Sequence, residues 1–109
     1  MGMVIQRFGV YLVALDPTQG HEMRKTRPAV VVSPNEINRT MGTVIIAPLT
    51  SRKRAYPFRQ NTTFAGKDGQ VALDQLRVVD KTRLLADLGP LDPHDQPSLL
   101  AKLQEMFTE

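Results

Sequence analysis

The chain has 109 residues, the size of one domain, and we therefore expect a single domain over residues 1–109. Apolar residues make up 41% of the chain, which is enough for one core, and no run predicts a membrane span or a secretory leader. The absence of cysteine excludes disulfides and thiolate metal sites and suits a cytoplasmic protein. The chain has only two histidines, which disfavours a histidine-rich metal site. We therefore expect no metal, no cofactor and a cytoplasmic location.

The net charge of +3 is unevenly distributed along the chain. Residues 1–79 contain eleven Lys/Arg and five Asp/Glu, whereas residues 80–109 contain three Lys/Arg and six Asp/Glu. The first part of the chain is therefore basic, which favours a polyanion such as a nucleic acid as its partner.

The first part of the chain predicts two strands separated by a charged loop. Residues 8–15 are rich in β-formers and are followed by turn residues. Residues 20–28 are polar and charged, and residues 29–33 begin with a four-residue apolar run that is typical of a buried strand. Pro28 donates no hydrogen bond and should open this strand, which leaves Arg27 extended at its entrance.

The middle of the chain predicts a third strand between irregular segments. Residues 33–38 are expected to break the preceding strand and to form a single helical turn. Residues 43–50 predict the third strand, in which Pro48 indicates a sheet edge or a bulge. A basic connection at residues 51–54 and a short extended piece at residues 56–59 follow.

Two further strands are predicted after this extended piece. Residues 66–69 predict a tight turn, and residues 70–79 alternate as a strand. The side chains of that strand expected to face inward are Val71, Leu73, Leu76 and Val78. Asp80 can cap a short helical turn that runs through Arg83, and residues 84–91 predict one more strand.

The end of the chain predicts a helix. Asp92 and Pro93 are a capping carboxylate and a proline suited to the first turn. An apolar stripe at helical spacing follows, formed by Leu99, Leu100, Leu103, Met106 and Phe107. Short strands with one terminal helix predict a mainly β fold, a small β-barrel or strongly bent sheet with the C-terminal helix packed on the sheet.

Several segments, taken in order and with their spacing, resemble the MazF/PemK (Kid) toxin family. They are residues 16–22 (DPTQGHE), 26–32 (TRPAVVV), 47–51 (APLTS), 56–58 (YPF) and 68–77 (DGQVALDQLR). The resemblance implies a homodimeric toxin of a bacterial toxin–antitoxin pair with an SH3-like β-barrel. It also implies a sequence-specific, metal-independent endoribonuclease that cuts single-stranded RNA, and a MazE-like antitoxin whose acidic C-terminal tail crosses the toxin's groove.

Metal-free RNA cleavage needs a base for the ribose 2′-hydroxyl, an acid for the departing 5′-oxygen and a cation at the phosphorane. Its products are a cyclic or 3′-phosphate and a 5′-hydroxyl. Arg27 is the candidate cation, because its planar fork meets two phosphate oxygens at once, and the resemblance also places the essential arginine here. An ion pair with Glu22 or Asp74 is its structural alternative. The resemblance gives Thr50 a contact with the scissile phosphate, whereas strand-end hydrogen bonding is the alternative.

The proton carriers are less sharply defined by the sequence. His21 has a side chain suited to proton transfer near neutral pH, and Glu22 matches an acidic position of the family. Asp74 matches the proposed base of the Kid-type branch, but this chain has Ala72 where that branch has an arginine. The departure at Ala72 moves the acid role towards Arg27 or His21. Our hypothesis is therefore that Glu22 or His21 accepts the proton and that Arg27 stabilises the phosphorane and helps to protonate the departing oxygen. The alternatives are a surface imidazole for His21 and a partner of Arg77 or a nearby arginine for Asp74.

The expected RNA-binding surface combines cations with polar and aromatic side chains. Its predicted members are Arg24, Lys25, Ser51, Arg52, Lys53, Arg54, Phe58, Gln75 and Arg77. Phe58, with Tyr56 beside it in sequence, could stack on a splayed base, and core or hinge packing is the alternative.

Two other functions remain as alternatives. One is a non-catalytic SH3-like module that binds RNA or a peptide. The other is a CcdB-like gyrase inhibitor, which the loop at residues 20–28 disfavours.

Overall fold

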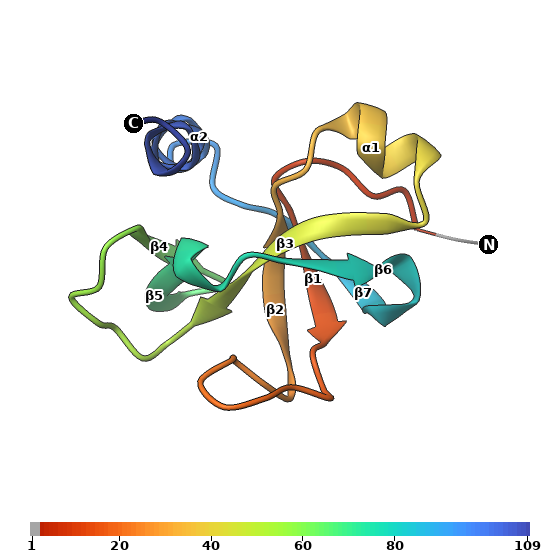
Figure 1. Ribbon diagram of the computed structural model, residues 1–109, viewed down its shortest axis with the longest axis horizontal. Coiled ribbons are helices and arrows are strands. Elements are labelled where there is room, and N and C mark those ends of the chain that lie inside the picture. The colour runs from red at the N-terminus through yellow and green to blue at the C-terminus, as the bar shows by residue number, and fades with distance from the viewer. Residues whose placement is uncertain (1–2) are drawn as a thin grey trace.

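The computed structural model describes residues 3–109, and within them a curled antiparallel sheet forms a half-barrel with a helix at its C-terminal end (Figure 1). The strand order is β4-β5-β3-β2-β1-β7, and β6 pairs with β3. The strands are β1 (Gly9–Ala14), β2 (Thr26–Val31), β3 (Thr43–Thr50), β4 (Arg59–Phe64), β5 (Lys67–Ala72), β6 (Arg77–Asp80) and β7 (Leu84–Pro90). The helices are α1 (Asn35–Thr40), α2 (Gln96–Met106) and the 3-10 turns η1 (Leu73–Gln75) and η2 (Lys81–Arg83). The mainly β fold with a C-terminal helix is confirmed.

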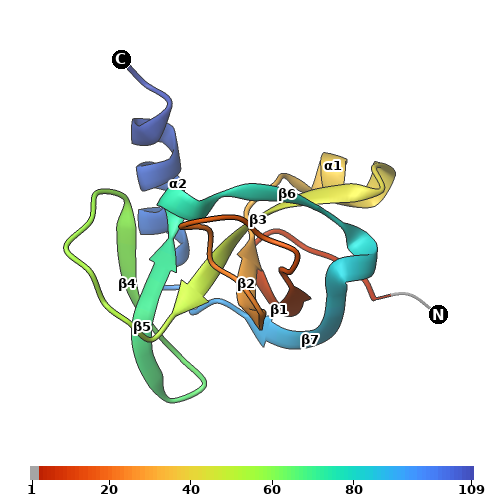
Figure 2. The same cartoon turned by 60° about the horizontal axis from the view of Figure 1, so that its bottom comes forward.

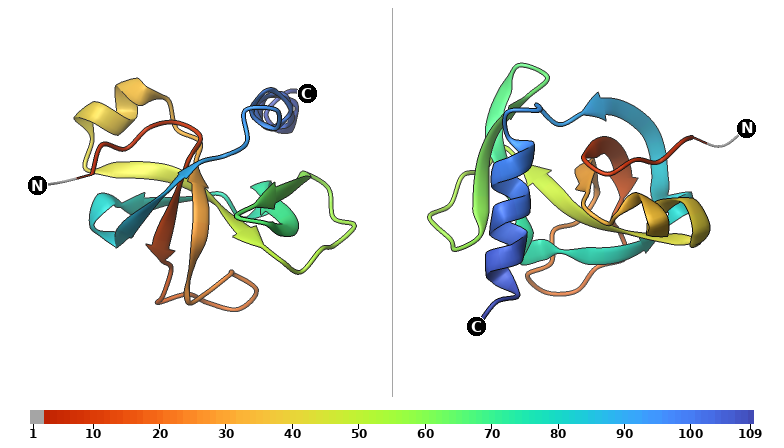
Figure 3. Two further views of the ribbon diagram at one scale, coloured as in Figure 1. Left: turned by 180° about the vertical axis from the view of Figure 1, so that it is seen from behind. Right: turned by 90° about the horizontal axis from the view of Figure 1, so that it is seen from above.

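Strand β2 is buried on both faces, which explains its uninterrupted apolar run. Ala29 and Val31 belong to a core cluster inside the curl of the sheet, together with residues of β1, β3, β6 and β7. Val30 belongs to a second cluster, which contains Leu99 of α2. Figure 3 shows α2 lying beside β4 and β5, so the helix covers this second cluster.

The edge of β3 that faces away from β2 pairs with two different strands. Its residues Thr43–Ile46 pair with β6, whereas Leu49 and Thr50 pair with β5. The carbonyl of Ile45 accepts a hydrogen bond from the Val32 N–H and therefore points toward β2. Because the backbone direction alternates along a strand, the nitrogen of Pro48, three residues later, points away from β2. It faces the gap between β6 and β5. Pro48 was expected at an edge or bulge, and it occupies this interruption of the ladder, where no N–H is needed.

The strand predicted over residues 70–79 is wrong as one element. It is divided into two strands, β5 and β6, with the turn η1 between them, and the two strands pair with different parts of β3. The break shifts the alternation, so Val78 is 60% exposed and Val79 is buried instead. Asp80 does cap the turn that follows, because its side chain accepts a hydrogen bond from the N–H of Thr82.

Two predicted boundaries also differ from the structure. The tight turn lies at Ala65 and Gly66, whose φ angles of 52° and 77° suit a two-residue hairpin, and β5 has already begun at Lys67. Helix α2 begins at Gln96 rather than at the predicted Asp92 and Pro93, because Asp92 accepts a hydrogen bond from the His94 N–H and forms a turn before it. No helix within residues 3–109 has the length and apolar character that crossing a membrane requires.

Candidate active site

The β1–β2 loop, residues 15–25, is held against the sheet by side chains from the second half of the chain. Gln75 accepts the N–H of Met23 over 3.1 Å, and Arg77 donates to the Leu15 carbonyl over 3.0 Å. Arg83 donates to the carbonyls at positions 14 and 16 over 3.0 and 2.7 Å. Figure 2 shows the loop folded toward η1 and the start of β6. Residues far apart in the sequence therefore hold this loop against the sheet.

A groove of about 310 Å³ lies between this loop and η1. It brings together five of the predicted site residues, together with three apolar ones. Its lining is His21, Glu22, Met23, Pro48, Asp74, Gln75, Leu76 and Arg77. An imidazole, two carboxylates and a guanidinium thus face one open space, which is the set of groups that proton transfer next to an anion needs.

Glu22 and His21 are both exposed at the tip of the loop. The Glu22 carboxylate accepts the N–H of Gln19 over 2.6 Å, and the Glu22 N–H donates to the Gln19 carbonyl over 3.1 Å. This reciprocal pair fixes the Glu22 side chain close to its own backbone while leaving it open to solvent. The carboxylate is therefore accessible to a ligand in the groove.

Asp74 forms an ion pair with an arginine, which is the structural alternative stated for it. Its partner is Arg59 and not Arg77. Nε and Nη2 of Arg59 bind the two carboxylate oxygens of Asp74, the latter over 3.1 Å. The Arg59 side chain is 4% exposed and lies 4.9 Å from the Tyr56 ring centroid. Both Asp74 oxygens are thus already engaged by a fixed cation.

Arg27 enters β2 opposite Val13 of β1, as expected for an extended residue at the strand entrance. Its Nε donates to the Arg24 carbonyl over 3.1 Å, and within residues 3–109 it makes no ion pair with Glu22 or Asp74. Arg27 as a residue is half-buried, and it is not among the residues that line the groove. The structure therefore leaves its Nη groups for another anion.

Thr50 lies where β3 leaves β2. The last paired residues of these two strands are Ala29 and Pro48, after which β3 pairs with β5. Arg27 and Thr50 each lie two residues beyond that last pair, where β2 and β3 are no longer paired. The Thr50 hydroxyl accepts the N–H of Arg52 over 3.1 Å, which is the strand-end contact expected as its alternative role.

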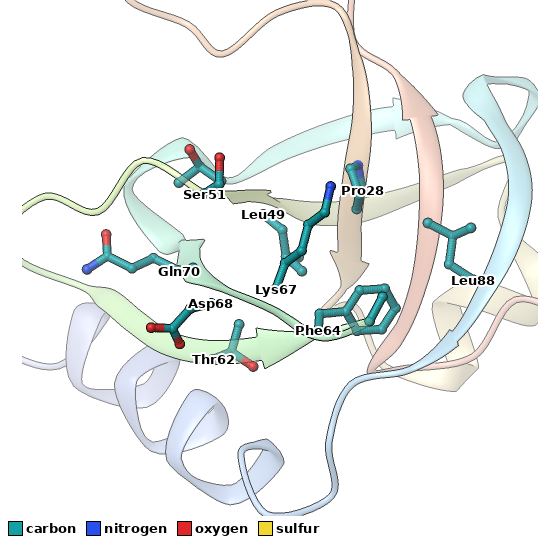
Figure 4. Close-up of a pocket in the computed structure, with 12 residues that line it drawn as sticks. Pro28, Leu49, Ser51, Thr62, Phe64, Lys67, Asp68, Gln70 and Leu88 are labelled. Atoms are coloured by element: carbon teal, nitrogen blue, oxygen red, sulfur yellow. The ribbon is translucent and has the colours of Figure 1, made fainter.

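A second hollow of about 360 Å³ lies on the other side of Thr50 and has an apolar floor (Figure 4). Pro28, Leu49, Phe64 and Leu88 form much of that floor, and Figure 4 shows Lys67 extending across the hollow toward Pro28. Thr50 and Ser51 line this hollow rather than the groove that contains His21 and Glu22. Of the predicted catalytic residues, His21, Glu22 and Asp74 therefore line the groove, Thr50 lines the hollow, and Arg27 lines neither.

Five of the six predicted cations are exposed on two loops, namely Arg24, Lys25, Arg52, Lys53 and Arg54. The sixth, Arg77, is half-buried at the start of β6 and donates to the Leu15 carbonyl. Lys53 binds Asp68 over 2.7 Å, and this hydrogen bond holds the pKa of the Asp68 carboxyl below its ordinary value. Phe58 is half-buried against the core cluster beneath α2, as its packing alternative required, whereas Tyr56 is 53% exposed.

Sequence reasoning missed Arg59 and Arg83. Arg59 was placed in a short extended piece, and nothing in that segment indicates a partner 15 residues away. Arg83 was expected only to end a helical turn, yet it holds the β1–β2 loop. Within residues 3–109 no three His, Asp or Glu side chains are grouped as metal ligands.

Comparison with known proteins identifies the family of the chain. A family model described as "PemK-like, MazF-like toxin of type II toxin-antitoxin system" matches residues 6–107. Over 96 residues the chain is 32% identical to the endoribonuclease toxin MazF of Escherichia coli K12, which covers 87% of this chain and 86% of that relative.

Two crystal structures from Deinococcus radiodurans share the fold. MazF alone superposes with a TM-score of 0.82 at 28% identity, covering 95% of this chain and 96% of that one. A MazE–MazF structure superposes with a TM-score of 0.76 at 30% identity and the same coverage. Because the family model spans nearly the whole chain and the folds agree, the chain belongs to the PemK-like, MazF-like toxin family of type II toxin–antitoxin systems.

Proposed function

We propose that this protein is a toxin endoribonuclease, one domain over residues 1–109, that cuts single-stranded mRNA in the cytoplasm and thereby arrests translation and growth. The observation that carries the proposal is the groove beside Asp74, where the exposed Glu22 and His21 face an open space bordered by cations. That arrangement suits metal-independent attack of a ribose 2′-hydroxyl on the adjacent phosphate.

The proton acceptor in this proposal is Glu22 or His21. Both are exposed in the groove, whereas the oxygens of Asp74 are already bound by Arg59. A carboxylate whose two oxygens are both bound by one guanidinium presents fewer free lone pairs to a substrate hydroxyl than an exposed carboxylate does. Asp74 therefore contributes fixed negative charge next to the groove.

Arg27 and Thr50 bind the scissile phosphate at the opening between β2 and β3. The Nη groups of Arg27 are oriented by the bond from its Nε to the Arg24 carbonyl, so a bidentate contact needs little reorganisation. The Thr50 hydroxyl can donate to a phosphate oxygen while it accepts the Arg52 N–H. Charge that develops on the phosphorane is thus met by a cation and a donor.

The exposed cations on the two loops guide the RNA strand, and the hollow beside Thr50 provides apolar surface for an unstacked base. Ser51, Gln75 and Arg77 border these depressions and complete the RNA-binding surface. Phosphate contacts of this kind position the strand, and base contacts select the cleavage sequence.

The protein acts as a homodimer with a MazE-like antitoxin as its inhibitor. Solved relatives include MazF with MazE from Deinococcus radiodurans and a mycobacterial endoribonuclease with its cognate antitoxin. An acidic, extended antitoxin tail complements the cationic loops around the groove, so its binding excludes RNA.

The test is incubation of the purified protein with a long single-stranded RNA in EDTA, followed by primer extension. We expect cuts at a recurring short sequence, with a 5′-hydroxyl on the downstream fragment, and suppression by saturating antitoxin. Bound but uncut RNA would instead support a binding module, and trapping of gyrase on DNA without RNA cleavage would support a CcdB-like inhibitor. Full cleavage in a saturated antitoxin complex would contradict the inhibitory role.

A further inference from the structure

We propose that Arg59 is a positioning residue for the β1–β2 loop, acting through Asp74 and η1, and this inference rests on the endoribonuclease function proposed above. Arg59 is the first residue of β4, and its side chain is almost fully buried at 4% exposure. A buried guanidinium requires partners for its donors, and this one donates to both oxygens of Asp74 and, over a longer 3.4 Å, to the amide oxygen of Gln70.

The first step is the contact between Arg59 and Asp74. Two guanidinium nitrogens bind the two oxygens of Asp74, while the Tyr56 ring lies against the guanidinium at 4.9 Å. A bidentate pair that is also stacked on a ring fixes orientation as well as distance. The Asp74 carboxylate therefore cannot rotate without breaking both bonds.

The second step runs from Asp74 to the loop. Asp74 and Gln75 are adjacent in the three-residue turn η1, and the Gln75 amide oxygen accepts the Met23 N–H over 3.1 Å. The Leu73 N–H donates to the Phe58 carbonyl over 3.1 Å, which joins η1 to the residue before Arg59 by the backbone too. One end of η1 is thus fixed to β4, and its other end holds the loop.

The third step is the position of the reacting groups. His21 and Glu22 immediately precede Met23, and both are exposed, so they have few packing contacts of their own. The Gln19–Glu22 pair acts within the loop, and Arg77 and Arg83 bind its first residues. The hydrogen bond between Gln75 and Met23 is therefore the side-chain contact from η1 next to His21 and Glu22. A displacement of about 1 Å in a catalytic group is enough to lower a rate about 100-fold.

The experiment compares Arg59→Ala, Arg59→Met and Arg59→Lys in the full-length protein, with Arg39→Ala as the matched control. Arg39 is an exposed arginine in the last turn of α1, remote in sequence from the groove residues. We expect Arg59→Ala and Arg59→Met to lower kcat for RNA cleavage by about 10- to 100-fold with a change in KM of less than about threefold. Arg59→Lys should restore part of the loss, since it keeps one charged donor.

A second measurement does not depend on cleavage. Amide hydrogen exchange at Met23 should accelerate at least about tenfold in Arg59→Met, whereas exchange at Val13 in β1 stays as in the wild type. Arg59→Met keeps an apolar stem of similar length, so it provides a folded variant if Arg59→Ala unfolds. Wild-type kcat together with unchanged Met23 exchange in Arg59→Met would overturn the inference.

Asp74→Asn separates positioning from proton transfer, because asparagine keeps an oxygen that can accept from Arg59. We expect this variant to retain cleavage within about tenfold of the wild type. Complete loss at every pH, with Met23 exchange unchanged, would identify Asp74 as the proton acceptor and overturn its positioning role. If the wild type cuts no RNA, the proposed function fails, and the exchange measurement still decides whether Arg59 holds the loop.

Discussion

Gly69 of β5 lies against the carbonyl oxygen of Thr50 in β3. A Cβ atom at Gly69 would overlap that oxygen, would crowd the Thr50 carbonyl carbon and would touch the Cα atom of Ser51. The neighbouring pair Thr50–Gln70 is in register, so this close approach is part of the ladder between the two strands. A glycine in β5 thereby sets the position of the strand end that carries Thr50.

Gly69→Ala should destabilise the protein by about 1–3 kcal/mol, because backbone atoms cannot rotate away from the added methyl group. RNA cleavage should fall as well, since the shift displaces Thr50. The measurement is urea unfolding combined with cleavage kinetics under conditions in which the variant is folded. Gly42→Ala is the matched control, because a Cβ there has no neighbour within 4 Å and should leave both properties unchanged.

Arg27→Ala should lower cleavage at least about 100-fold while changing the melting temperature little. Its one side-chain hydrogen bond is an exposed contact to the Arg24 carbonyl, so its loss has a small structural effect. Arg27→Lys should not restore activity, because an ammonium group cannot make a bidentate contact with phosphate. Circular dichroism melting and single-turnover cleavage check both statements, and normal cutting by Arg27→Ala would remove this residue from the mechanism.

Tyr11 should make the stability of the fold sensitive to alkaline pH. Its ring is 2% exposed, and its hydroxyl donates to the Val4 carbonyl and accepts from the Gln6 N–H. Burial raises the pKa of the Tyr11 hydroxyl above its ordinary value of 10.0. The unfolded chain therefore loses this proton first, so the stabilisation is complete below about pH 10 and decreases as pH rises toward the folded-state pKa.

The measurement is the free energy of unfolding in urea at pH 8 and at pH 10.5. Tyr11→Phe should lower stability by about 1–3 kcal/mol at pH 8, through its two lost hydrogen bonds, and should show a smaller decrease between the two pH values. Tyr56→Phe is the control and should keep the wild-type decrease, because Tyr11 is intact. Equal pH dependence in Tyr11→Phe and wild type would contradict the prediction.

The basic connection between β3 and β4 should account for part of the salt dependence of RNA binding. Replacing Arg52, Lys53 and Arg54 together by alanine should make the slope of the log of the RNA-binding constant against the log of salt concentration about two units shallower. Each phosphate contact to a single strand contributes about 0.7 to that slope, and three contacts are lost. Binding is measured with RNA that contains 2′-deoxyribose and so lacks the nucleophile. The control, Arg39→Ala with Lys102→Ala, removes two cations elsewhere, and an unchanged slope in the triple variant would exclude these residues from the RNA path.

The strands with a strong local pattern could be predicted from the sequence. The prediction for β3 matches the structure at both ends, because a continuous β-branched run between turn residues identifies a buried strand. The prediction over residues 70–79 failed because both flanks of η1 have a strand-like pattern, and only the division of β3 between two partners shows where one strand ends and the next begins. The start of α2 was misplaced because two prolines and two aspartates offer competing starts.

The residue types of the candidate site were also present in the sequence pattern, but their arrangement was not. His21, Glu22 and Asp74 do meet in one groove, while Thr50 lines the neighbouring hollow. Arg59 could not be predicted, since its bond to Asp74 depends on how β4 and β5 pair rather than on any local motif.

The sequence by itself determined the fold class, the family and the residue types available for chemistry, because apolar periodicity and ordered motifs are properties of neighbouring residues. Only the tertiary structure decided which ions pair, which side chains hold the β1–β2 loop and which face an open groove. Those contacts join residues up to 69 positions apart, and only the register of the sheet brings such residues together.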